Sequence, residues 1–247
     1  MKRILDFILS LIGLVLASPI LLPTIFLVWI QDWHSPFYIA PRVGKKERLF
    51  KMLKLRSMII NADKSGVDST SSNDKRITGV GRFIRKYKMD ELSQLWNVLI
   101  GDMSLVGPRP NVKRETDLYT SQEKLLLTVK PGITDFSSIV FSDEGDILKD
   151  QVDPDIAYNQ LIRPGKSMLG IFYIKNRSIF IDLQLILLTA VAIVSKENAL
   201  KGVVRLLRKL KAEDILLQIA SREKELVPMP PPGATNIVTN REGRVDF

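Results

Sequence analysis

The sequence predicts an α+β, mostly helical protein with an apolar membrane helix at its N-terminus, a small β-hairpin and amphipathic interfacial helices. Three observations support this class: an uncharged stretch from Phe7 to Gln31, two strand-like segments after it, and apolar residues at helical spacing in later segments. The chain has 247 residues, of which 45% are hydrophobic and 26% charged, so it can form one substantial folded domain.

The composition excludes several chemistries. The chain has no Cys and one His, so it can form neither a disulfide framework, a thiolate nucleophile nor a multi-histidine metal centre. Catalysis would therefore depend mainly on carboxylates, hydroxyls, Lys or Arg. The 36 Lys and Arg residues against 27 Asp and Glu give a net charge of +9, which favours an anionic partner such as a phosphate-bearing substrate, a membrane surface or a nucleic acid.

The uncharged N-terminal stretch would form a helix about 37 Å long, enough to cross a bilayer. Pro19 and Pro23 predict a bend or a break near its midpoint, where the Ser18 hydroxyl can satisfy a carbonyl that Pro19 leaves free. Basic residues flank the stretch on both sides, as expected if both ends face the cytoplasm. A re-entrant helix and a kinked transmembrane span remain open, whereas a cleaved signal peptide fits least because the apolar run continues to Ile30.

The next segment reads as a β-hairpin, with strands within residues 37–44 and 48–58 and a turn near Gly44. Lys54 and Arg56 are two residues apart and would share one face of the second strand, where both could contact an anionic substrate. Residues 63–75 are polar and lack periodicity, which predicts a solvated loop that could act as a lid.

A helix is predicted from Met89 to Leu99, ending at Gly101. It places Asp90 and Glu91 in its first turn, where the helix dipole stabilises ionised carboxylates. Such a pair is often only a favourable capping feature, but cationic residues lie before and after it. Carboxylates that can bind a divalent cation, beside Arg groups that can grip phosphate oxygens, are typical of phosphoryl transfer.

The segment from Asp90 to Pro110 resembles the signature of the bacterial sugar transferase family, which are small monotopic polyprenyl-phosphate phosphoglycosyl transferases. The resemblance covers about three quarters of the chain and ends near Thr189. It includes the Ser18-Pro19 pair, Arg42-Val43-Gly44, Lys54-Leu55-Arg56-Ser57-Met58 and Lys130-Pro131-Gly132-Ile133-Thr134. It implies a monotopic protein whose N-terminal segment is a re-entrant helix-break-helix.

The resemblance also implies a reaction. A UDP-sugar would give its sugar 1-phosphate to undecaprenyl phosphate and release UMP, with Mg²⁺ as cofactor and a phosphosugar bound covalently to Asp90 as intermediate. Glu91 would assist in metal binding or proton handling, with Asp90 and Glu91 as the metal ligands. Arg85 would contact phosphate, and Pro108, Arg109 and Pro110 would hold the nucleotide. This step would initiate a lipid-linked glycan for polysaccharide biosynthesis and supply downstream glycosyltransferases.

Four sites depart from the family pattern. Ser93 replaces a usual Pro and Pro41 a usual Gln, and neither change removes a proposed reactive group. Asp135 begins a segment, Asp135-Phe136-Ser137-Ser138, that differs from the common Gly-Trp-Ala-Gln and bears on the identity of the sugar. Arg177 stands where Trp is frequent, which bears on packing of the last membrane-facing part.

The C-terminal part is predicted to be helical. Residues 178–195 read as a buried or interfacial helix. The next helix has one apolar and one basic face, which suits either an anionic lipid surface or docking on the domain. The expected organisation is a re-entrant helix (1–32), a cytoplasmic catalytic domain (33–195), a basic amphipathic extension (196–227), and a Pro-rich linker with a flexible tail (228–247).

Three functions compete on the sequence. The leading one is a phosphoglycosyl transferase on the cytoplasmic face of a bacterial inner membrane, with no nucleic acid partner. A non-catalytic membrane adaptor for anionic lipid or nucleic acid would explain the charge and the apolar helix, but not the Asp90-Glu91 and Pro108-Arg109-Pro110 elements. A glycosyltransferase that passes sugar alone would release UDP instead of UMP.

Overall fold

The computed structural model describes residues 1–62, 70 and 73–240 and is mostly helical. Most of the loop predicted as a possible lid (63–75), namely residues 63–69 and 71–72, lies outside the described residues. In chain order the elements are α1 (Lys2–Ile30), β1 (Phe37–Val43), η1 (Lys45–Glu47), β2 (Leu49–Leu55), α2 (Gly79–Lys86), α3 (Met89–Leu92), α4 (Leu95–Ile100), β3 (Ser104–Val106), α5 (Lys113–Thr116), η3 (Glu123–Thr128), β4 (Gly132–Thr134), α6 (Phe136–Val140), α7 (Glu144–Ile147), α8 (Pro154–Ala157), η4 (Tyr158–Ile162), α9 (Arg163–Asn176), α10 (Ile179–Val194), α11 (Lys196–Lys209) and α12 (Asp214–Ser221).

The predicted β-hairpin is confirmed. Strands β1 and β2 pair antiparallel, with Phe37 opposite Leu55 and Val43 opposite Leu49, and the short helix η1 forms the connection. A second sheet was not predicted: β3 and β4 pair in parallel, with Ser104 opposite Gly132. Its strands are only three residues long and come from distant parts of the chain, so no local pattern identifies them.

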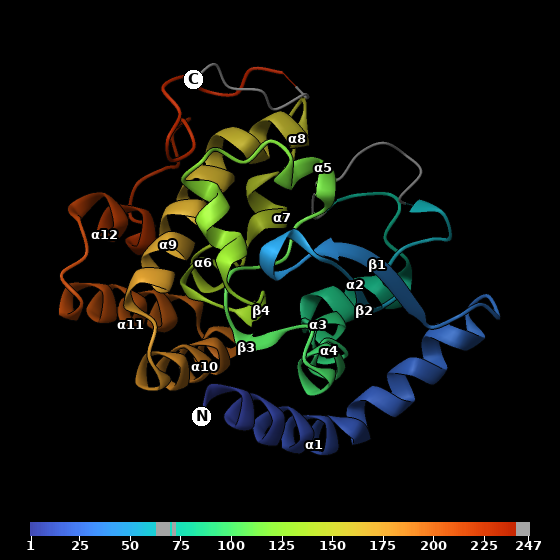
Figure 1. Cartoon of the computed structure of the whole chain (residues 1–247). Helices are drawn as coiled ribbons and strands as arrows, with labels where there is room; N and C mark the ends of the chain where they lie inside the picture. The colour runs from blue at the N-terminus through green and yellow to red at the C-terminus, as the bar shows by residue number, and fades with distance from the viewer. Residues whose placement is uncertain (63–69, 71–72, 241–247) are drawn as a thin grey trace.

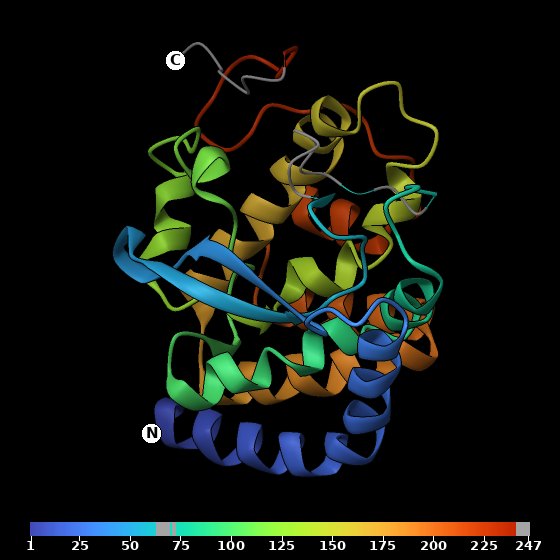
Figure 2. The same ribbon diagram turned by 90° about the vertical axis from the view of Figure 1, so that its right-hand side faces the viewer.

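Helix α1 is one bent helix rather than two helices separated by a break. Figure 2 shows its first half running along the base of the molecule and its second half turning upward. Pro19 lacks the N–H that would bond the carbonyl of Val15, and the Ser18 hydroxyl donates to that carbonyl at 2.7 Å instead. The predicted role of Ser18 is therefore confirmed. Because this bond and the surrounding helical geometry persist, the prolines bend the helix without ending it.

Polar contacts attach the first turns of α1 to the domain. The Asp6 carboxylate accepts hydrogen bonds from Ser104 Oγ at 2.9 Å and from the Leu105 backbone N–H at 3.2 Å. Arg3 donates to the carbonyl of Leu99 at 2.7 Å, and Lys2 forms an ion pair with Asp182. These contacts hold α1 across the base of the domain (Figure 1).

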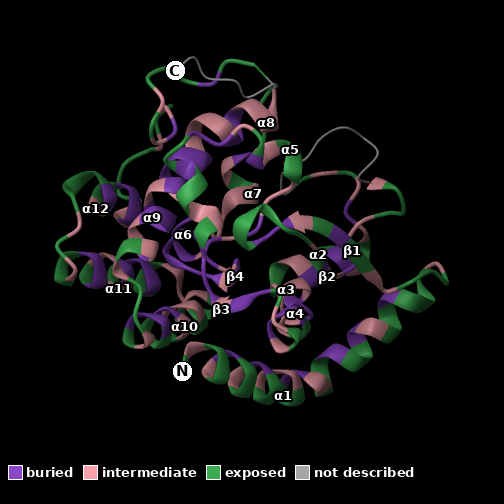
Figure 3. Ribbon diagram, in the orientation of Figure 1, coloured by how far each residue is buried: buried purple, intermediate pink, exposed green. Residues whose placement is uncertain are grey.

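Most large apolar residues of α1 are exposed, and much of the helix is coloured as exposed or intermediate in Figure 3. Helix α1 is long and apolar enough to cross a bilayer, and only 22% of its most apolar window is buried, unlike the core helix of a soluble protein. Leu16 is 73% exposed, and on the neighbouring helix α10 Phe180 is 80% exposed. A helix with this many exposed large apolar side chains is typical of a contact with a membrane or another protein.

The main hydrophobic core lies among α6, α9, α10, α11 and α12. The apolar face of α11 belongs to it, since Ala199, Val203 and Leu207 are fully buried. Of the two alternatives for this helix, docking on the domain therefore accounts for its apolar face. Its basic face remains exposed, namely Lys201, Arg205, Arg208 and Lys209.

The predicted flexible tail is held against the domain in its described part, up to residue 240. Gln160 Nε2 donates to the carbonyl of Val238 at 2.6 Å, and the Val238 side chain is fully buried. The backbone N–H of Met229 bonds the carbonyl of Gln160 at 3.1 Å. The sequence of this segment shows no periodic pattern, so these tertiary contacts could not be predicted from it.

Candidate active site

The segment carrying Asp90 and Glu91 forms two short helices, α3 and α4, rather than the single helix predicted. The backbone N–H of Gln94 donates to the carbonyl of Glu91, three residues earlier, at 3.1 Å. The Ser93 hydroxyl donates to the carbonyl of Asp90 at 2.9 Å. A side chain that competes for a backbone carbonyl in this way interrupts the regular helix. The predicted end at Gly101 is confirmed, because that residue adopts the left-handed conformation with φ of 96°.

Side-chain bonds attach α4 to the hairpin. Buried Asn97 accepts a hydrogen bond from the Leu53 backbone N–H at 2.8 Å and donates to the Lys51 carbonyl at 2.7 Å. Its side chain therefore makes the bonds to β2 that the backbone of a neighbouring strand would make. Ser93 Oγ lies 3.2 Å from the carbonyl of Leu53. These contacts fix β2 beside α3 and bring Lys54 close to Asp90.

The second sheet positions Arg109. Gly107 and Gly132 allow the two strands to approach closely: a Cβ at Gly132 would lie 2.1 Å from Gly107 N, so no other residue fits. Gly107 N donates to the Thr134 carbonyl at 2.9 Å, and Gly132 N donates to the Pro108 carbonyl at 3.0 Å. The sheet thus holds the Pro108-Arg109-Pro110 segment against the start of β4, with the Arg109 side chain reaching α3.

Four of the predicted side chains converge around Asp90. Arg109 donates to Glu91 Oε1 at 2.8 Å. Lys54, Arg85 and Arg109 each interact electrostatically with the Asp90 carboxylate. Asp90 is half-buried, and no hydrogen bond or ion pair engages its carboxylate within the part of the chain that the structure describes. An unpaired carboxylate surrounded by three cations is suited to attack a phosphate.

Arg85 is positioned by a hydrogen bond to Ser57 and by the close approach of α2 to the Ser57 backbone. Its Nε donates to Ser57 Oγ at 3.0 Å. A Cβ at Gly81 would lie 1.9 Å from the Ser57 carbonyl, so α2 approaches this backbone as closely as only glycine allows. Burial lowers the pKa of Arg85 and nearby Asp90 opposes that shift, but an Arg remains charged at any physiological pH.

The charges of the site shift each other's pKa values. Burial favours the neutral form of Glu91, yet Arg109, Lys88 and Lys54 outweigh it and lower the pKa of this carboxyl below its usual value. Glu91 in turn raises the pKa of Arg109. Burial, together with Arg109, lowers the pKa of Lys54 to about 8 from its usual 10.5, against the opposing effect of Asp90. Glu91 and Arg109 therefore remain a charged pair, while Lys54 titrates near physiological pH.

Lys54 predicts a pH dependence. Its ammonium charge is lost as the pH rises through about 8, so kcat/KM for an anionic substrate should fall on the alkaline side with that apparent pKa. Lys54→Arg should move this fall to higher pH, because a guanidinium does not deprotonate there. The check is kcat/KM from pH 6 to 10 for both variants. A wild-type fall near pH 8 that Lys54→Arg does not move would contradict a role for this ammonium group.

The two carboxylates fit a magnesium site completed by substrate. Mg²⁺ is usually held in proteins by one or two carboxylates together with phosphate oxygens and water. Asp90 offers a free carboxylate, and Glu91 keeps the oxygen that Arg109 does not bond. No group of three or more His, Asp or Glu residues that could hold a metal is found among residues 1–62, 70 and 73–240. A cation bound by Asp90 and Glu91 would therefore take its remaining ligands from a substrate or from water.

Arg56 does not join this cluster, although it was predicted to bind substrate beside Lys54. Strand β2 ends at Leu55. The buried guanidinium of Arg56 forms an ion pair with Asp32, in which Nη2 donates to Asp32 Oδ1 at 2.6 Å. It also donates to the carbonyl of Ser35 at 2.8 Å. In the structure Arg56 connects the end of α1 to the hairpin.

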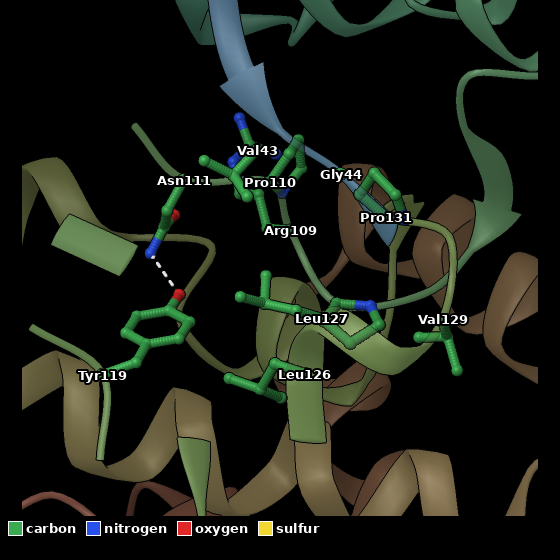
Figure 4. A pocket seen from close by; sticks show the side chains of 11 residues that line it. Val43, Gly44, Arg109, Pro110, Asn111, Tyr119, Leu126, Leu127, Val129 and Pro131 are labelled. Atoms are coloured by element: carbon green, nitrogen blue, oxygen red, sulfur yellow. Dashed lines mark hydrogen bonds between the residues drawn. The ribbon is translucent and has the colours of Figure 1, made fainter. Parts of the chain in front are cut away.

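Two pockets meet at Arg109. Figure 4 shows the first, which has mainly apolar walls that include Pro110, Leu126 and Leu127. Asn111 Nδ2 donates to the Tyr119 hydroxyl at 2.9 Å across one side of it. The second pocket shares Pro108 and Arg109 with the first and is lined by more polar groups. Pro108 and Arg109 therefore contribute to the walls of both pockets.

Several residues near the site were not predicted. Arg42 interacts electrostatically with Arg109, and Glu144 interacts with both Arg109 and Lys54. Glu144 also forms an ion pair with Lys166, which lines the second pocket. Arg42 lies in a motif that the sequence did single out. Nothing in the sequence around Glu144 and Lys166 indicated a role.

The chain is similar to a known protein family and to several named proteins. A family model described as bacterial sugar transferase matches residues 1–196. The chain is 32% identical over 193 residues to a UDP-N-acetylgalactosamine-undecaprenyl-phosphate N-acetylgalactosaminephosphotransferase of Aeromonas hydrophila, covering 76% of this chain and 42% of that protein. It is 33% identical over 214 residues to an undecaprenyl-phosphate galactose phosphotransferase of Salmonella typhimurium, covering 81% and 41%.

A third relative is a UDP-glucose:undecaprenyl-phosphate glucose-1-phosphate transferase of Klebsiella pneumoniae, 36% identical over 192 residues, with 76% of this chain and 39% of that protein covered. The chain thus spans about two fifths of the length of these relatives. Their names share undecaprenyl phosphate and differ in the sugar. Because the family model covers most of the chain, including every element of the cluster around Asp90, the chain belongs to the bacterial sugar transferase family.

Proposed function

We propose that the chain transfers a sugar 1-phosphate from a UDP-sugar to undecaprenyl phosphate and releases UMP, with Asp90 as the nucleophile. The observation that supports this most strongly is the Asp90 carboxylate itself, which is unpaired within the described residues and lies among Lys54, Arg85 and Arg109. The names of three relatives, all undecaprenyl-phosphate sugar phosphotransferases, support the substrate class. The product would initiate a lipid-linked polysaccharide.

The proposed reaction has two displacements at one phosphorus. A carboxylate oxygen of Asp90 attacks the phosphorus that bears the sugar, and the bond from that phosphorus to the bridging oxygen breaks, so that UMP leaves with the electron pair. The sugar phosphate is then an acyl phosphate on Asp90. A phosphate oxygen of undecaprenyl phosphate attacks the same phosphorus, and the bond to Asp90 breaks. The carboxylate is regenerated, and the lipid diphosphate sugar is released.

The cations assist both steps by charge. Arg109 can grip phosphate oxygens with the part of its guanidinium that does not bond Glu91, and Lys54 and Arg85 neutralise charge as it moves to UMP. Mg²⁺, when bound by Asp90 and Glu91, would offset the repulsion between an anionic nucleophile and a diphosphate. Arg109 would also keep Glu91 ionised and oriented toward this cation.

We further propose that α1 enters and leaves the membrane on the cytoplasmic face of the bacterial inner membrane. The bend at Pro19, the exposed apolar surface of α1 and α10, and the basic residues on both flanks support this arrangement. The contacts of Arg3 and Asp6 with the domain support it as well, because they hold the N-terminus on the same side as the catalytic groups.

The topology can be tested with single cysteines, because the chain has none. Ile4→Cys and Lys46→Cys, both at exposed positions on either side of the apolar stretch, are expressed in intact cells with a permeable outer membrane. Neither should react with a membrane-impermeant maleimide until the inner membrane is opened. If α1 spans the membrane, one of the two will react in intact cells and the other will not.

The activity is tested with purified protein, Mg²⁺, undecaprenyl phosphate and a panel of UDP-sugars. The proposal predicts release of UMP in equal amount to a lipid-linked sugar diphosphate, identified by mass spectrometry. Release of UDP would instead indicate transfer of sugar alone. Salt-sensitive binding to anionic vesicles without turnover of any UDP-sugar would favour the membrane adaptor.

A further inference from the structure

The second pocket contains a buried carboxylate with a free oxygen. Asp135 is fully buried at the start of α6. Its Oδ1 accepts hydrogen bonds from Ser137 Oγ at 2.7 Å, Ser138 N at 2.8 Å and Ser138 Oγ at 2.9 Å. Its Oδ2 is buried and has no hydrogen-bond partner among the residues that the structure describes. Oδ1 thus caps the helix, and Oδ2 forms no hydrogen bond within the described part of the protein.

A free carboxylate oxygen at such a site is unfavourable unless a ligand supplies a donor. Burial raises the pKa of Asp135, and the three bonds to Oδ1 only oppose this shift. A hydrogen-bond donor placed at Oδ2 would stabilise the ionised carboxylate and lower its pKa again. Capping needs a single oxygen, so Ser or Asn would cap the helix as well as Asp. The second oxygen therefore requires an explanation other than capping.

The position of Asp135 connects it to the proposed reaction centre. Asp135 and Arg109 line the same pocket, and Arg109 is bonded to Glu91 next to Asp90. A Cβ at Gly170 would lie 3.9 Å from Oδ2 and 3.8 Å from Pro108 Cβ, so Oδ2 is close to the wall formed by the Pro108-Arg109-Pro110 segment. A substrate whose phosphate contacts Arg109 can therefore extend toward Asp135.

The two pockets differ in the chemistry of the residues that line only one of them. The first has mainly apolar walls, which suit the flat face of a base. The second is lined by groups that can bond hydroxyls, among them Ser137, Ser167, Lys166 and Asp135. The relatives share undecaprenyl phosphate in their names and differ in their sugars, so the residues that face the sugar are expected to differ among them.

We infer that the free oxygen of Asp135 accepts a hydrogen bond from an O–H or N–H group of the donor sugar, and that Asp135 is a specificity-determining residue for that sugar. The inference rests on the proposed function and deepens it. It adds a polar contact to the sugar, separate from the groups that act on the phosphates. Binding sites built to bond one hydroxyl discriminate strongly against an analogue that lacks it, because the buried partner is then left unpaired.

The test uses Asp135→Asn and Asp135→Ser in the full-length protein. Asn keeps the capping oxygen and places a donor where the free acceptor was, whereas Ser keeps the cap and removes the free group. Each variant and the wild type are assayed with UDP-glucose, UDP-galactose and their N-acetylamino counterparts, and then with deoxy analogues of the preferred sugar. UMP affinity is measured by calorimetry alongside. Asp153→Asn, at the cap of α8 and outside both pockets, is the matched control.

The inference predicts that both variants lose about 10- to 100-fold in kcat/KM on the preferred sugar, the range for a hydrogen bond to a charged group. One deoxy analogue should show a similar loss with the wild type and no further loss with Asp135→Asn. UMP affinity should not change. A loss of the same factor on every sugar and analogue, or an equal loss of UMP affinity, would overturn the inference.

The two proposals fail in different ways. If the wild type turns over or binds a UDP-sugar but the order of preference among sugars is the same in both variants, the role of Asp135 is wrong and the proposed function stands. If the wild type neither binds nor turns over any UDP-sugar by calorimetry and assay, both are wrong. Thermal unfolding of each variant shows whether a uniform loss follows from lost capping, since a weakened cap lowers Tm without changing selectivity.

Discussion

Asp90→Asn is expected to lower kcat for sugar phosphate transfer by about 10³-fold or more. The amide is nearly the same size as the carboxylate but is not an anionic nucleophile, so the first displacement cannot form the acyl phosphate. No hydrogen bond or ion pair to the Asp90 carboxylate exists within the described residues, so the substitution removes no direct contact there. The measurement is UMP release, with thermal unfolding as the check on folding.

Asp102→Asn is the matched control for this prediction. Asp102 lies in the same motif, at an exposed position just after α4. The substitution therefore removes one negative charge, as Asp90→Asn does, without changing the cluster around Asp90. It should leave kcat within about two-fold of wild type, as expected for a surface substitution. Wild-type turnover by Asp90→Asn would show that Asp90 is not the nucleophile.

Arg109→Ala is expected to have the second-largest effect, a loss of about 10²-fold or more in kcat/KM, the scale seen when one charged group that stabilises a transition state is removed. The substitution removes the 2.8 Å bond to Glu91 and would also remove the proposed phosphate contact. Because Arg109 is the main group that lowers the pKa of Glu91, the pKa of this carboxyl should rise in the variant. The acidic limb of the kcat/KM profile should therefore move to higher pH.

Arg109→Lys separates charge from geometry. Lys keeps the positive charge but cannot bond Glu91 and a phosphate oxygen with one planar group, so it should recover only part of the loss. Arg114→Ala, at an exposed position on α5, serves as the control and should be close to wild type. Equal activity of Arg109→Ala and Arg114→Ala would rule out the proposed contact with phosphate.

Elements with strong local signals could be predicted from the sequence. The hairpin follows from two apolar, β-prone runs around a Gly-containing turn, and the end of α4 follows from a glycine in the left-handed region. The bond of Ser18 to the carbonyl freed by Pro19 follows from the covalent structure of proline alone. In each case the determining interaction joins residues close in sequence.

Features that depend on distant residues could not be predicted. At the split between α3 and α4, Ser93 Oγ donates to the carbonyl of Asp90 and also lies 3.2 Å from the carbonyl of Leu53, which is on another element. The pairing of β3 with β4 depends on a close approach of Gly107 and Gly132. Neither contact produces a hydrophobic periodicity that can be recognised within a short stretch of sequence.

Arg56 and Asp135 show the same limit at the site. Arg56 was placed beside Lys54 by strand alternation, but its partner Asp32 is 24 residues earlier in the sequence, just after the end of α1. Asp135 was noticed only as a departure from the family pattern, and its free oxygen is visible only once α9 and the Pro108-Arg109-Pro110 segment are placed around it. By contrast, the charges of Asp90, Glu91, Arg85 and Arg109 were predicted to lie together, and the structure brings them together.

The central claim, that Asp90 carries the sugar phosphate, is tested most directly by mass spectrometry of the protein after mixing with a UDP-sugar and Mg²⁺ in the absence of undecaprenyl phosphate. The account predicts a burst of about one UMP per active protein and a mass increase of one sugar phosphate on the peptide that contains Asp90, discharged when the lipid phosphate is added. Release of UMP only after the lipid is added, with no modified peptide, would contradict it.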